Sequence, residues 1–215
     1  MSIILASGSP RRYELLKMTG IEDFKVIADN SEELILPELS AEEQVIRLSI
    51  QKAHNVSKKC SKEDTIIAAD TLVYLDEEPL GKPTSRADAE MMLGKLSGRK
   101  HSVFTGLTLK KGNEQISKAE KTDVYFREIT TCEIETYVAT GEPMDKAGSY
   151  AIQGGAAVFV ERIEGDYYNI VGLPLCKLSM MLKEFGAKSV KDELSPHKYV
   201  PPQAAEWNNY ESIDQ

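Results

Sequence analysis

The stretch IILASGSPRRYELLK, residues 3–17, joins a short apolar run to a helical pattern through a polar turn. The apolar run, residues 3–6, has the composition of a buried strand. Ser9 suits an N-cap, and Pro10 suits the first helical position, where its missing N–H is no loss. The stretch therefore predicts a strand, a tight turn and a helix that begins at Pro10.

The start of this predicted helix is a candidate anion site. Free N–H groups and the positive end of the helix dipole face whatever lies there. Arg11 and Arg12 add two guanidinium groups that suit phosphate oxygens. Taken by itself, the stretch leaves two interpretations open, a polyphosphate site or an ordinary capped helix with surface arginines.

The composition of the whole chain is that of a globular protein. It has 215 residues, 41% of them hydrophobic and 28% charged, which suffices for one sizeable domain or two small lobes. The formal net charge of −8 argues against partners bound through bulk electrostatics, so we expect neither a nucleic-acid polymer nor a membrane as partner. No apolar run approaches the ~20 residues of a membrane span.

The three cysteines, Cys60, Cys132 and Cys176, are widely spaced and lie near no histidine cluster. They indicate neither a disulfide framework nor a zinc site. We therefore expect a cytoplasmic protein.

Beyond residue 17, strand-like and helical patterns alternate along the chain. Strands are expected at 24–28, 65–75, 101–110, 121–128 and 156–163, helices from 40, 85 and 131 and over 174–185, and turns at 77–83 and 165–168. The alternation predicts an α/β fold with a mixed twisted sheet and flanking helices. We place the domain at residues 1–186 and treat residues 187–215 as a tail that is poorly ordered or docked as an arm.

Asp70 is the strongest candidate for a catalytic group. It follows the apolar run 65–69, where burial raises the pKa of a carboxyl group or demands a cationic partner. As a general base it could take a proton from water, and as a ligand it could hold Mg²⁺ against phosphate oxygens. The competing interpretation is a structural acid that caps a turn through Thr71.

Four further residues suit phosphate or nucleotide chemistry by type. Glu33 supplies a carboxylate for a hard cation, Lys52 and Lys82 supply point charges, and Gln153 before two glycines suits a nucleobase edge. Each also has an ordinary explanation as a solvated turn, a surface charge or a glycine turn. With three histidines in the chain, no Ser-His-Asp or Cys-His arrangement is indicated, which disfavours nucleophilic catalysis.

Six separated motifs together resemble the Maf family of nucleotide pyrophosphatases. They are SGSPRR at 7–12 with ELL at 14–16, ADT at 69–71, GKP at 81–83, LSGRKH at 96–101, EPMDKAG at 142–148 and VGLP at 171–174. Their order and spacing match from residue 3 to about residue 185. The resemblance implies an inosine-triphosphatase-like fold, with two lobes around a substrate cleft, and it leaves the tail uncovered.

The resemblance also implies a reaction, the hydrolysis of nucleoside triphosphates to monophosphate and pyrophosphate with Mg²⁺ or Mn²⁺ as cofactor. Asp70 matches the family's proton acceptor, and Glu33 matches an acid of its cleft, so both are metal-ligand candidates. Matches to the phosphate-binding residues are Ser7, Arg11, Arg12, Lys52 and Lys82.

Three positions that distinguish branches of the family carry Arg12, Thr71 and Gln153. Asp70 and Thr71, with IQG at 152–154, resemble the branch that acts on dTTP and UTP. CTP and modified pyrimidine nucleotides stay open as further substrates.

The alternative function is a nucleotide-binding regulator without significant catalysis, in line with the family's description as inhibitors of septum formation. Binding and hydrolysis would use the same cleft. A house-cleaning role, a link to arrest of cell division and a homodimer are left open by the sequence.

Overall fold

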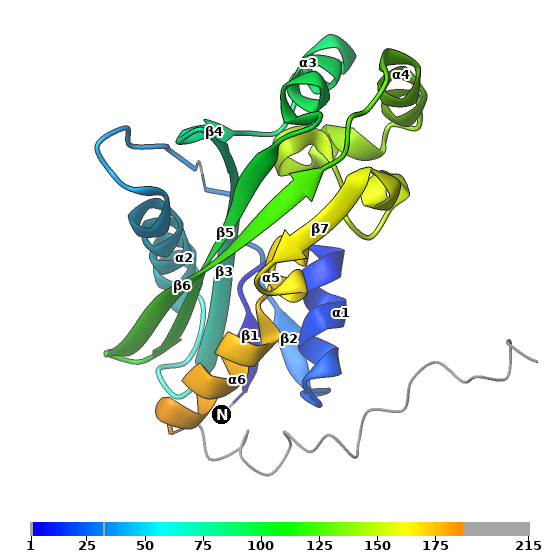
Figure 1. The fold of residues 1–215 in the computed structure, drawn as a ribbon. Coiled ribbons are helices and arrows are strands. Elements are labelled where there is room, and N and C mark those ends of the chain that lie inside the picture. The colour runs from blue at the N-terminus through cyan, green and yellow to red at the C-terminus, as the bar shows by residue number, and fades with distance from the viewer. Residues whose placement is uncertain (1, 32, 187–215) are drawn as a thin grey trace, which may run out of the picture.

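The protein is built on one mixed seven-stranded sheet, which the computed structural model describes for residues 2–31 and 33–186 (Figure 1). The hydrogen-bonded order is β2-β1-β3-β5-β6-β7, and β4 pairs with β3. β1 is parallel to both β2 and β3, whereas β3, β5, β6 and β7 are antiparallel neighbours. A mixed sheet with flanking helices confirms the predicted α/β class.

The strands are β1 (Ile3–Leu5), β2 (Phe24–Val26), β3 (Thr65–Leu75), β4 (Glu78–Leu80), β5 (Lys100–Lys111), β6 (Glu114–Phe126) and β7 (Val160–Glu164). The helices are α1 (Pro10–Met18), α2 (Ala41–Ser57), α3 (Arg86–Leu96), α4 (Thr131–Ala139), α5 (Tyr167–Val171) and α6 (Leu175–Glu184). Three 3₁₀ helices complete the described elements: η1 (Glu142–Asp145), η2 (Ala147–Ser149) and η3 (Gly155–Phe159).

A gap in the sheet arises because β1 and β4 cover only the two ends of one edge of β3. β1 pairs with β3 from Thr65 to Ile67, and β4 pairs with it from Val73 to Leu75. Over residues 68–72 no described strand pairs with this edge, whereas the other edge stays paired with β5. The chain leaves β1 beside this gap and turns into α1, so the motif at residues 7–12 faces the middle of β3.

Helices cover both sides of the sheet, with α2 on one side and α1 on the other (Figure 1). Side chains alternate along β3, so Ile66 and Ala68 pack with residues of α2, while Ile67 and Ala69 pack with residues of α1 and α6. The same alternation places Asp70 on the α2 side and Thr71 on the α1 side.

Helix α2 comes unusually close to the sheet at Gly106 of β5. A Cβ atom at this position would lie 2.1 Å from the carbonyl oxygen of Val45, so only glycine fits there. Gly106 is the cross-strand neighbour of Asp70. Lys52 lies two turns beyond Val45 on the same helix face, and the close approach therefore brings Lys52 to Asp70.

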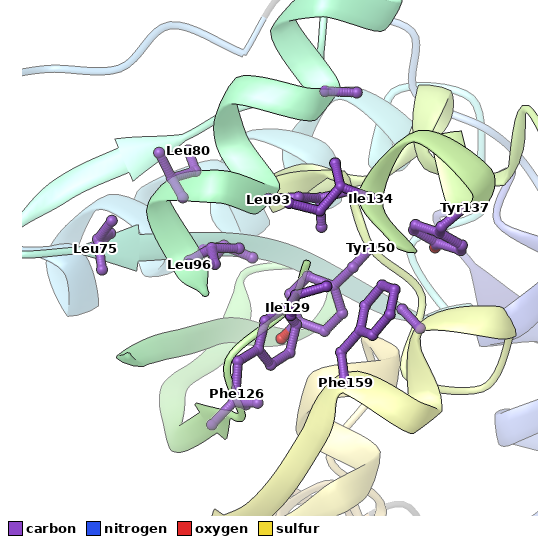
Figure 2. Close-up of a cluster of buried hydrophobic side chains, with 14 of the residues drawn as sticks. Leu75, Leu80, Leu93, Leu96, Phe126, Ile129, Ile134, Tyr137, Tyr150 and Phe159 are labelled. Atoms are coloured by element: carbon purple, nitrogen blue, oxygen red, sulfur yellow. The ribbon is translucent and has the colours of Figure 1, made fainter. Parts of the chain in front are cut away.

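A second hydrophobic cluster packs α3 and α4 against the β4 end of the sheet. Figure 2 shows its aromatic part, in which Phe126, Tyr137, Tyr150 and Phe159 lie beside leucines of α3. Ring centroids are 4.9 Å apart for Phe126 and Tyr150 and 5.5 Å apart for Tyr137 and Phe159. This cluster forms the part of the molecule that lies across the gap from α1.

Three elements differ from the prediction. The expected turn at 77–83 contains β4, because Asp76 and Glu77 adopt φ of 49° and 70° and close a tight hairpin. The strand expected at 156–163 begins only at Val160. Before it, η3 brings Ala156 and Phe159 into the same cluster, as its three-residue period allows.

The expected turn at 165–168 is the start of α5, where the Asp166 carboxylate accepts from the N–H of Tyr168. Ser9 occupies the N-cap position of α1, but its side chain makes no capping hydrogen bond. Within the described ranges, no helix is both long and apolar enough to cross a membrane. The prediction for residues 187–215 lies outside the described residues.

Candidate active site

A cavity of about 380 Å³ opens at the gap in the sheet. All nine residues singled out in the sequence line it: Ser7, Arg11, Arg12, Glu33, Lys52, Asp70, Thr71, Lys82 and Gln153. They come from the β1–α1 turn, the first turn of α1, the loop before α2, α2, β3 and the segments after β4 and η2. The fold therefore brings residues that are up to 146 positions apart in the sequence to one place.

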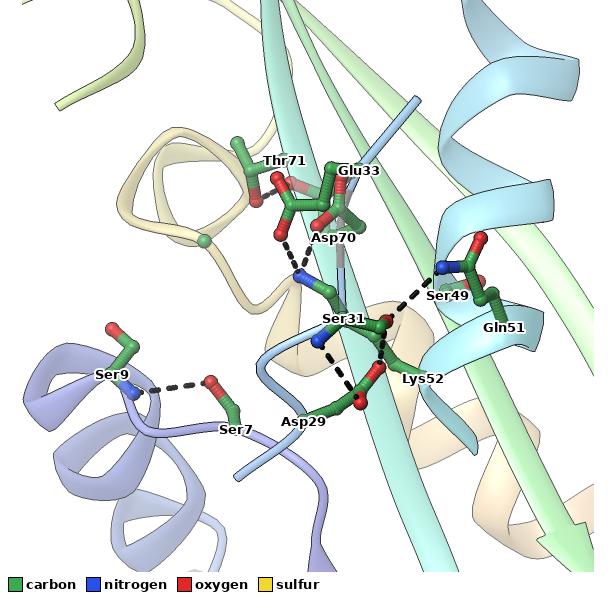
Figure 3. Close-up of polar contacts among 12 residues, drawn as sticks. Ser7, Ser9, Asp29, Ser31, Glu33, Ser49, Gln51, Lys52, Asp70 and Thr71 are labelled. Atoms are coloured by element: carbon green, nitrogen blue, oxygen red, sulfur yellow. Dashed lines mark hydrogen bonds and ion pairs between the residues drawn. The ribbon is translucent and has the colours of Figure 1, made fainter. Parts of the chain in front are cut away.

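On the α2 side of the cavity, one ammonium group lies between two carboxylates (Figure 3). Lys52 Nζ lies 2.6 Å from Glu33 Oε1 and also bonds to Asp70 Oδ1. Asp70 is 3% exposed and Lys52 is 8% exposed. Because Asp70 lies inside β3 and bonds to Lys52, the interpretation of this residue as a turn cap through Thr71 is wrong.

Burial raises the pKa of the Asp70 carboxyl group above its ordinary value; the charge of Lys52 opposes this shift, and that of Glu33 adds to it. Burial also acts to raise the pKa of Glu33, but Lys52, Lys82 and Arg12 together leave it lowered. Asp70 Oδ2 is buried and has no hydrogen-bond partner among the described residues. A buried carboxylate oxygen without a partner is costly, so this atom is poised to receive a proton, a water molecule or a cation.

Glu33 lies in a loop that is anchored to α2 on both sides of the residue. Before it, Asp29 accepts a hydrogen bond from Ser31 (Figure 3). Asp29 also accepts from the side-chain amide of Asn55 in α2. After it, Gln44 donates to the carbonyl of Leu34 at 2.9 Å. These bonds hold the Glu33 carboxylate beside Lys52.

The chemistry of the two carboxylates suits a hard divalent cation. The described residues contain no cluster of three or more His, Cys, Asp or Glu side chains that could hold a metal ion by themselves. Mg²⁺, however, commonly takes one or two carboxylates and completes its shell with water and substrate phosphates. Asp70, through its unpartnered Oδ2, and Glu33 fit that pattern.

On the α1 side of the cavity, Arg12 is held by three neutral oxygens. Its Nε donates to the carbonyl of Gly172 at 2.8 Å, Nη1 to Ser7 Oγ at 3.3 Å and Nη2 to Thr71 Oγ1 at 3.0 Å. Burial lowers the pKa of this guanidinium group, and the charges of Asp70 and Glu33 oppose the shift. The remaining two N–H groups of Arg12 are available to a ligand.

Ser7 completes this side of the cavity. Its Oγ accepts from the N–H of Ser9 (Figure 3). It also accepts from Arg12, so its own hydrogen remains available for a ligand oxygen. The side chains of Arg11, Lys82 and Gln153 line the cavity without a hydrogen bond to any other described residue. Their polar groups are therefore not committed to a partner among the described residues.

Three further residues hold Arg12 in place directly or through Thr71, and the sequence alone predicted no role for them: Gly172, Thr105 and Asn169. Thr105 lies opposite Thr71 on β5, and their hydroxyl groups are 2.8 Å apart. Thr105 also bonds to the carbonyl of Asn169. A polar residue inside the apolar run of β5 was the available signal for Thr105, and Gly172 stood in a quoted motif.

Comparisons with known proteins agree with this picture. The family model described as Maf-like protein matches residues 2–185. A dTTP/UTP pyrophosphatase from Caldicellulosiruptor bescii is 47% identical over 197 residues, which covers 89% of this chain and 98% of the relative. Another from Geotalea uraniireducens is 50% identical over 188 residues and covers 86% of this chain and 96% of the relative.

Among solved structures, a HAM1 protein from Coxiella burnetii aligns with 86% of this chain and 99% of its own, with 17% identity and a TM-score of 0.48. The match of the family model to nearly all described residues, together with relatives near half identity over almost their full length, shows that this chain belongs to the Maf family.

Proposed function

We propose that this protein hydrolyses nucleoside triphosphates, dTTP and UTP among them, to the nucleoside monophosphate and pyrophosphate. The relatives that carry the name dTTP/UTP pyrophosphatase support the reaction and the substrates. The observation that carries the mechanism is the buried, unpartnered Oδ2 of Asp70 in a cavity that also holds free cationic side chains. Water attacks the α-phosphorus, and Asp70 is the base.

Asp70 has the properties of a general base for this step. Its raised pKa makes the ionised carboxylate a stronger base than a surface aspartate, because proton affinity rises with pKa. Lys52 holds Oδ1 and thereby leaves Oδ2 to take the proton of the attacking water. Lys52 is itself only 8% exposed, so its packed side chain has little freedom to move. Its bond to Oδ1 therefore also fixes the direction of the carboxylate.

Cationic side chains gathered in the cavity bind the triphosphate, although the formal net charge of the whole chain is −8. Arg11, Arg12 and Lys82 face the cavity, and Ser7 has a hydroxyl hydrogen to donate. Donors already aimed at the ligand stabilise the charge that develops on the leaving pyrophosphate as the bond to the α-phosphorus breaks. One such donor contributes about 3 kcal/mol on the scale of an oxyanion-hole group.

Mg²⁺ or Mn²⁺ held by Glu33 and by one lone pair of Asp70 Oδ2 is part of the proposal. The second lone pair of that oxygen would take the proton of the attacking water. When bound, such an ion would neutralise phosphate charge and polarise the phosphorus centre. Lys52 pairs with the same two carboxylates and balances one of their two negative charges, so the ion would bind beside a net negative charge.

Gln153 is proposed to contact the base. Gln153 lines the cavity, and its amide carries both a donor and an acceptor, as the edge of a pyrimidine base requires. Replacing Gln153 with Ala should change the ranking of dTTP, UTP and CTP as substrates and leave the metal dependence intact. An unchanged ranking would remove Gln153 from base recognition.

The experiment that tests the proposed reaction measures product release from dTTP, UTP, CTP and purine triphosphates with Mg²⁺ or Mn²⁺, in water enriched in ¹⁸O. Attack at the α-phosphorus places the label in the monophosphate and leaves the pyrophosphate unlabelled. Label in pyrophosphate, or release of orthophosphate alone, would contradict the proposal.

The second candidate is a nucleotide-binding regulator, because the same cavity suits binding without turnover. Binding of nucleotide with no pyrophosphate release from either wild type or Asp70→Asn would favour it. The cytoplasmic location, the homodimer and the link to cell division stay predictions.

A further inference from the structure

A chain of hydrogen bonds connects Arg12 to the interior of the protein. Arg12 Nη2 donates to Thr71, and Thr71 Oγ1 lies 2.8 Å from Thr105 Oγ1. Thr105 Oγ1 then donates to the carbonyl of Asn169 at 3.0 Å. Thr105 and Asn169 are both 0% exposed, so water does not compete for these groups.

The single hydrogen of each hydroxyl group sets the direction of this chain. A carbonyl oxygen only accepts, so the hydrogen of Thr105 is used on Asn169. In the contact between the two threonines, Thr71 must then be the donor. Its hydrogen points into the core, and Thr71 offers only lone pairs to Arg12 and to the cavity.

Asn169 is itself fixed, which makes this direction a stable property of the fold. Its side-chain amide donates to the carbonyl of Val103 and to Thr122 Oγ1, both at 3.0 Å. The main-chain carbonyl of Asn169 also accepts from the N–H of Gly172. The carbonyl of Gly172 in turn accepts from Arg12 Nε. Two of the three anchors of Arg12, Gly172 and Thr71, therefore depend on the same short helix, α5.

We propose that Thr105 is a positioning residue of the active site, which holds Thr71 as a pure acceptor so that Arg12 keeps its orientation toward the triphosphate. The inference rests on the proposed function for the identity of the ligand. It also implies that Thr71 makes no hydrogen bond to a phosphate oxygen. Any ligand atom in contact with the Thr71 hydroxyl must be a donor, as the imide N–H of uracil or thymine is.

The test replaces Thr105 with valine, which keeps the shape and removes the hydroxyl. The Asn169 carbonyl stays paired through Gly172, so the main loss is the acceptor for Thr71. Thr105→Ser restores that acceptor. Thr108→Val is the matched control, since Thr108 is also fully buried on β5, its hydroxyl bonds to Ser49 and Ser117, and none of these three lines the cavity.

Two measurements separate positioning from a general loss of stability. The first is the affinity for α,β-imido UTP with Mg²⁺, an analogue whose α–β bridge resists hydrolysis. We expect Thr105→Val to weaken it about fivefold, the scale of one hydrogen bond, with Thr105→Ser and Thr108→Val within about twofold of wild type. The second is turnover of UTP, in which KM should rise while the pH dependence of kcat stays unchanged.

Several outcomes would overturn the inference. They are wild-type affinity in Thr105→Val, an equal loss of affinity in Thr108→Val, and a Thr105→Ser variant that binds as weakly as Thr105→Val. If wild type binds the analogue and releases no pyrophosphate from UTP, the proposed function fails while the affinities still decide the role of Thr105. A wild type that binds no nucleotide would overturn both.

Discussion

Two neighbouring residues of β3, Asp70 and Thr71, belong to opposite sides of the sheet and to different kinds of chemistry. On the α2 side, Asp70, Lys52 and Glu33 form a cluster of charges with one unpartnered buried oxygen. On the α1 side, Thr71 belongs to a network in which Arg12 is held by neutral oxygens. The gap in the sheet is what lets both sides reach one cavity.

The difference indicates a division of labour within a single strand. The α2 side has carboxylates that can exchange a proton, whereas the α1 side has hydrogen bonds that hold Arg12 and Thr71 in fixed orientations. Changes on the α2 side should therefore alter the rate and its pH dependence, and changes on the α1 side should alter binding and stability.

The largest effect is expected for Asp70→Asn. Loss of the base should lower kcat about 10³-fold, within the range for general base catalysis. The free energy of unfolding at neutral pH should not fall, because ionised Asp70, whose pKa burial raises, opposes folding there. Steady-state kinetics and urea denaturation measure the two quantities. A variant with a tenth of wild-type turnover would rule out Asp70 as the base.

Arg12→Lys should lower kcat/KM about 10²-fold, because an ammonium group cannot reproduce the three-way anchoring of the guanidinium group and still face the triphosphate. Arg11→Lys is the control. Arg11 lines the cavity without a hydrogen bond to another described residue, so its replacement should cost less than tenfold. Equal losses for the two variants would show that the network around Arg12 has no role in orienting it.

His101, on the α1 side of the sheet, should make the free energy of unfolding depend on pH. It is 2% exposed, Nε2 lies 2.8 Å from the Tyr150 hydroxyl, and burial lowers its pKa to about 4. The unfolded chain binds more protons between that pKa and about 6.5, so stability falls as pH drops through this window.

From pH 7 to 4.5 the loss attributable to His101 should be about 2 kcal/mol. Urea denaturation of wild type and His101→Gln at both pH values measures it. The variant is less stable at pH 7 but should lose less on acidification. Identical pH dependence in the two proteins would mean that His101 does not titrate in this way.

The smallest effects are shifts in the acid limb of the kcat/KM profile. Lys52 lowers the pKa of Asp70 and Glu33 raises it, against the larger effect of burial. Lys52→Met should therefore move the acid limb to higher pH and Glu33→Gln to lower pH. Profiles that shift in the same direction for both variants would show that the acid limb does not report Asp70.

Local patterns in the sequence predicted much of this fold. The strand, turn and helix at residues 3–17 and the helix expected from residue 40, which Ser40 caps, are present in the structure, because their signals lie within a few residues. β4 and η3 escaped prediction, since a tight hairpin and a single 3₁₀ turn leave weak periodic signals. The candidate residues were found by their type and by family resemblance.

The partners of those residues could not be read from the sequence. Thr71 and Thr105 are 34 positions apart, and Thr105 and Asn169 are 64 apart, so their contacts depend on strand register and on where α5 packs. The division between the two sides of β3 follows from alternation in a strand. Which helix packs on each face, and therefore which residues meet Asp70 and Thr71, depends on the tertiary structure.

The gap in the sheet has a consequence for the behaviour of the protein in solution. An unpaired strand edge usually invites another molecule to add a strand, which is a route to aggregation. Here the open segment, residues 68–72, is bounded by β1 at one end and β4 at the other, and charged side chains surround it. An extended polypeptide finds no room to pair there, while a compact anion does, so the opening that admits a substrate also resists self-association.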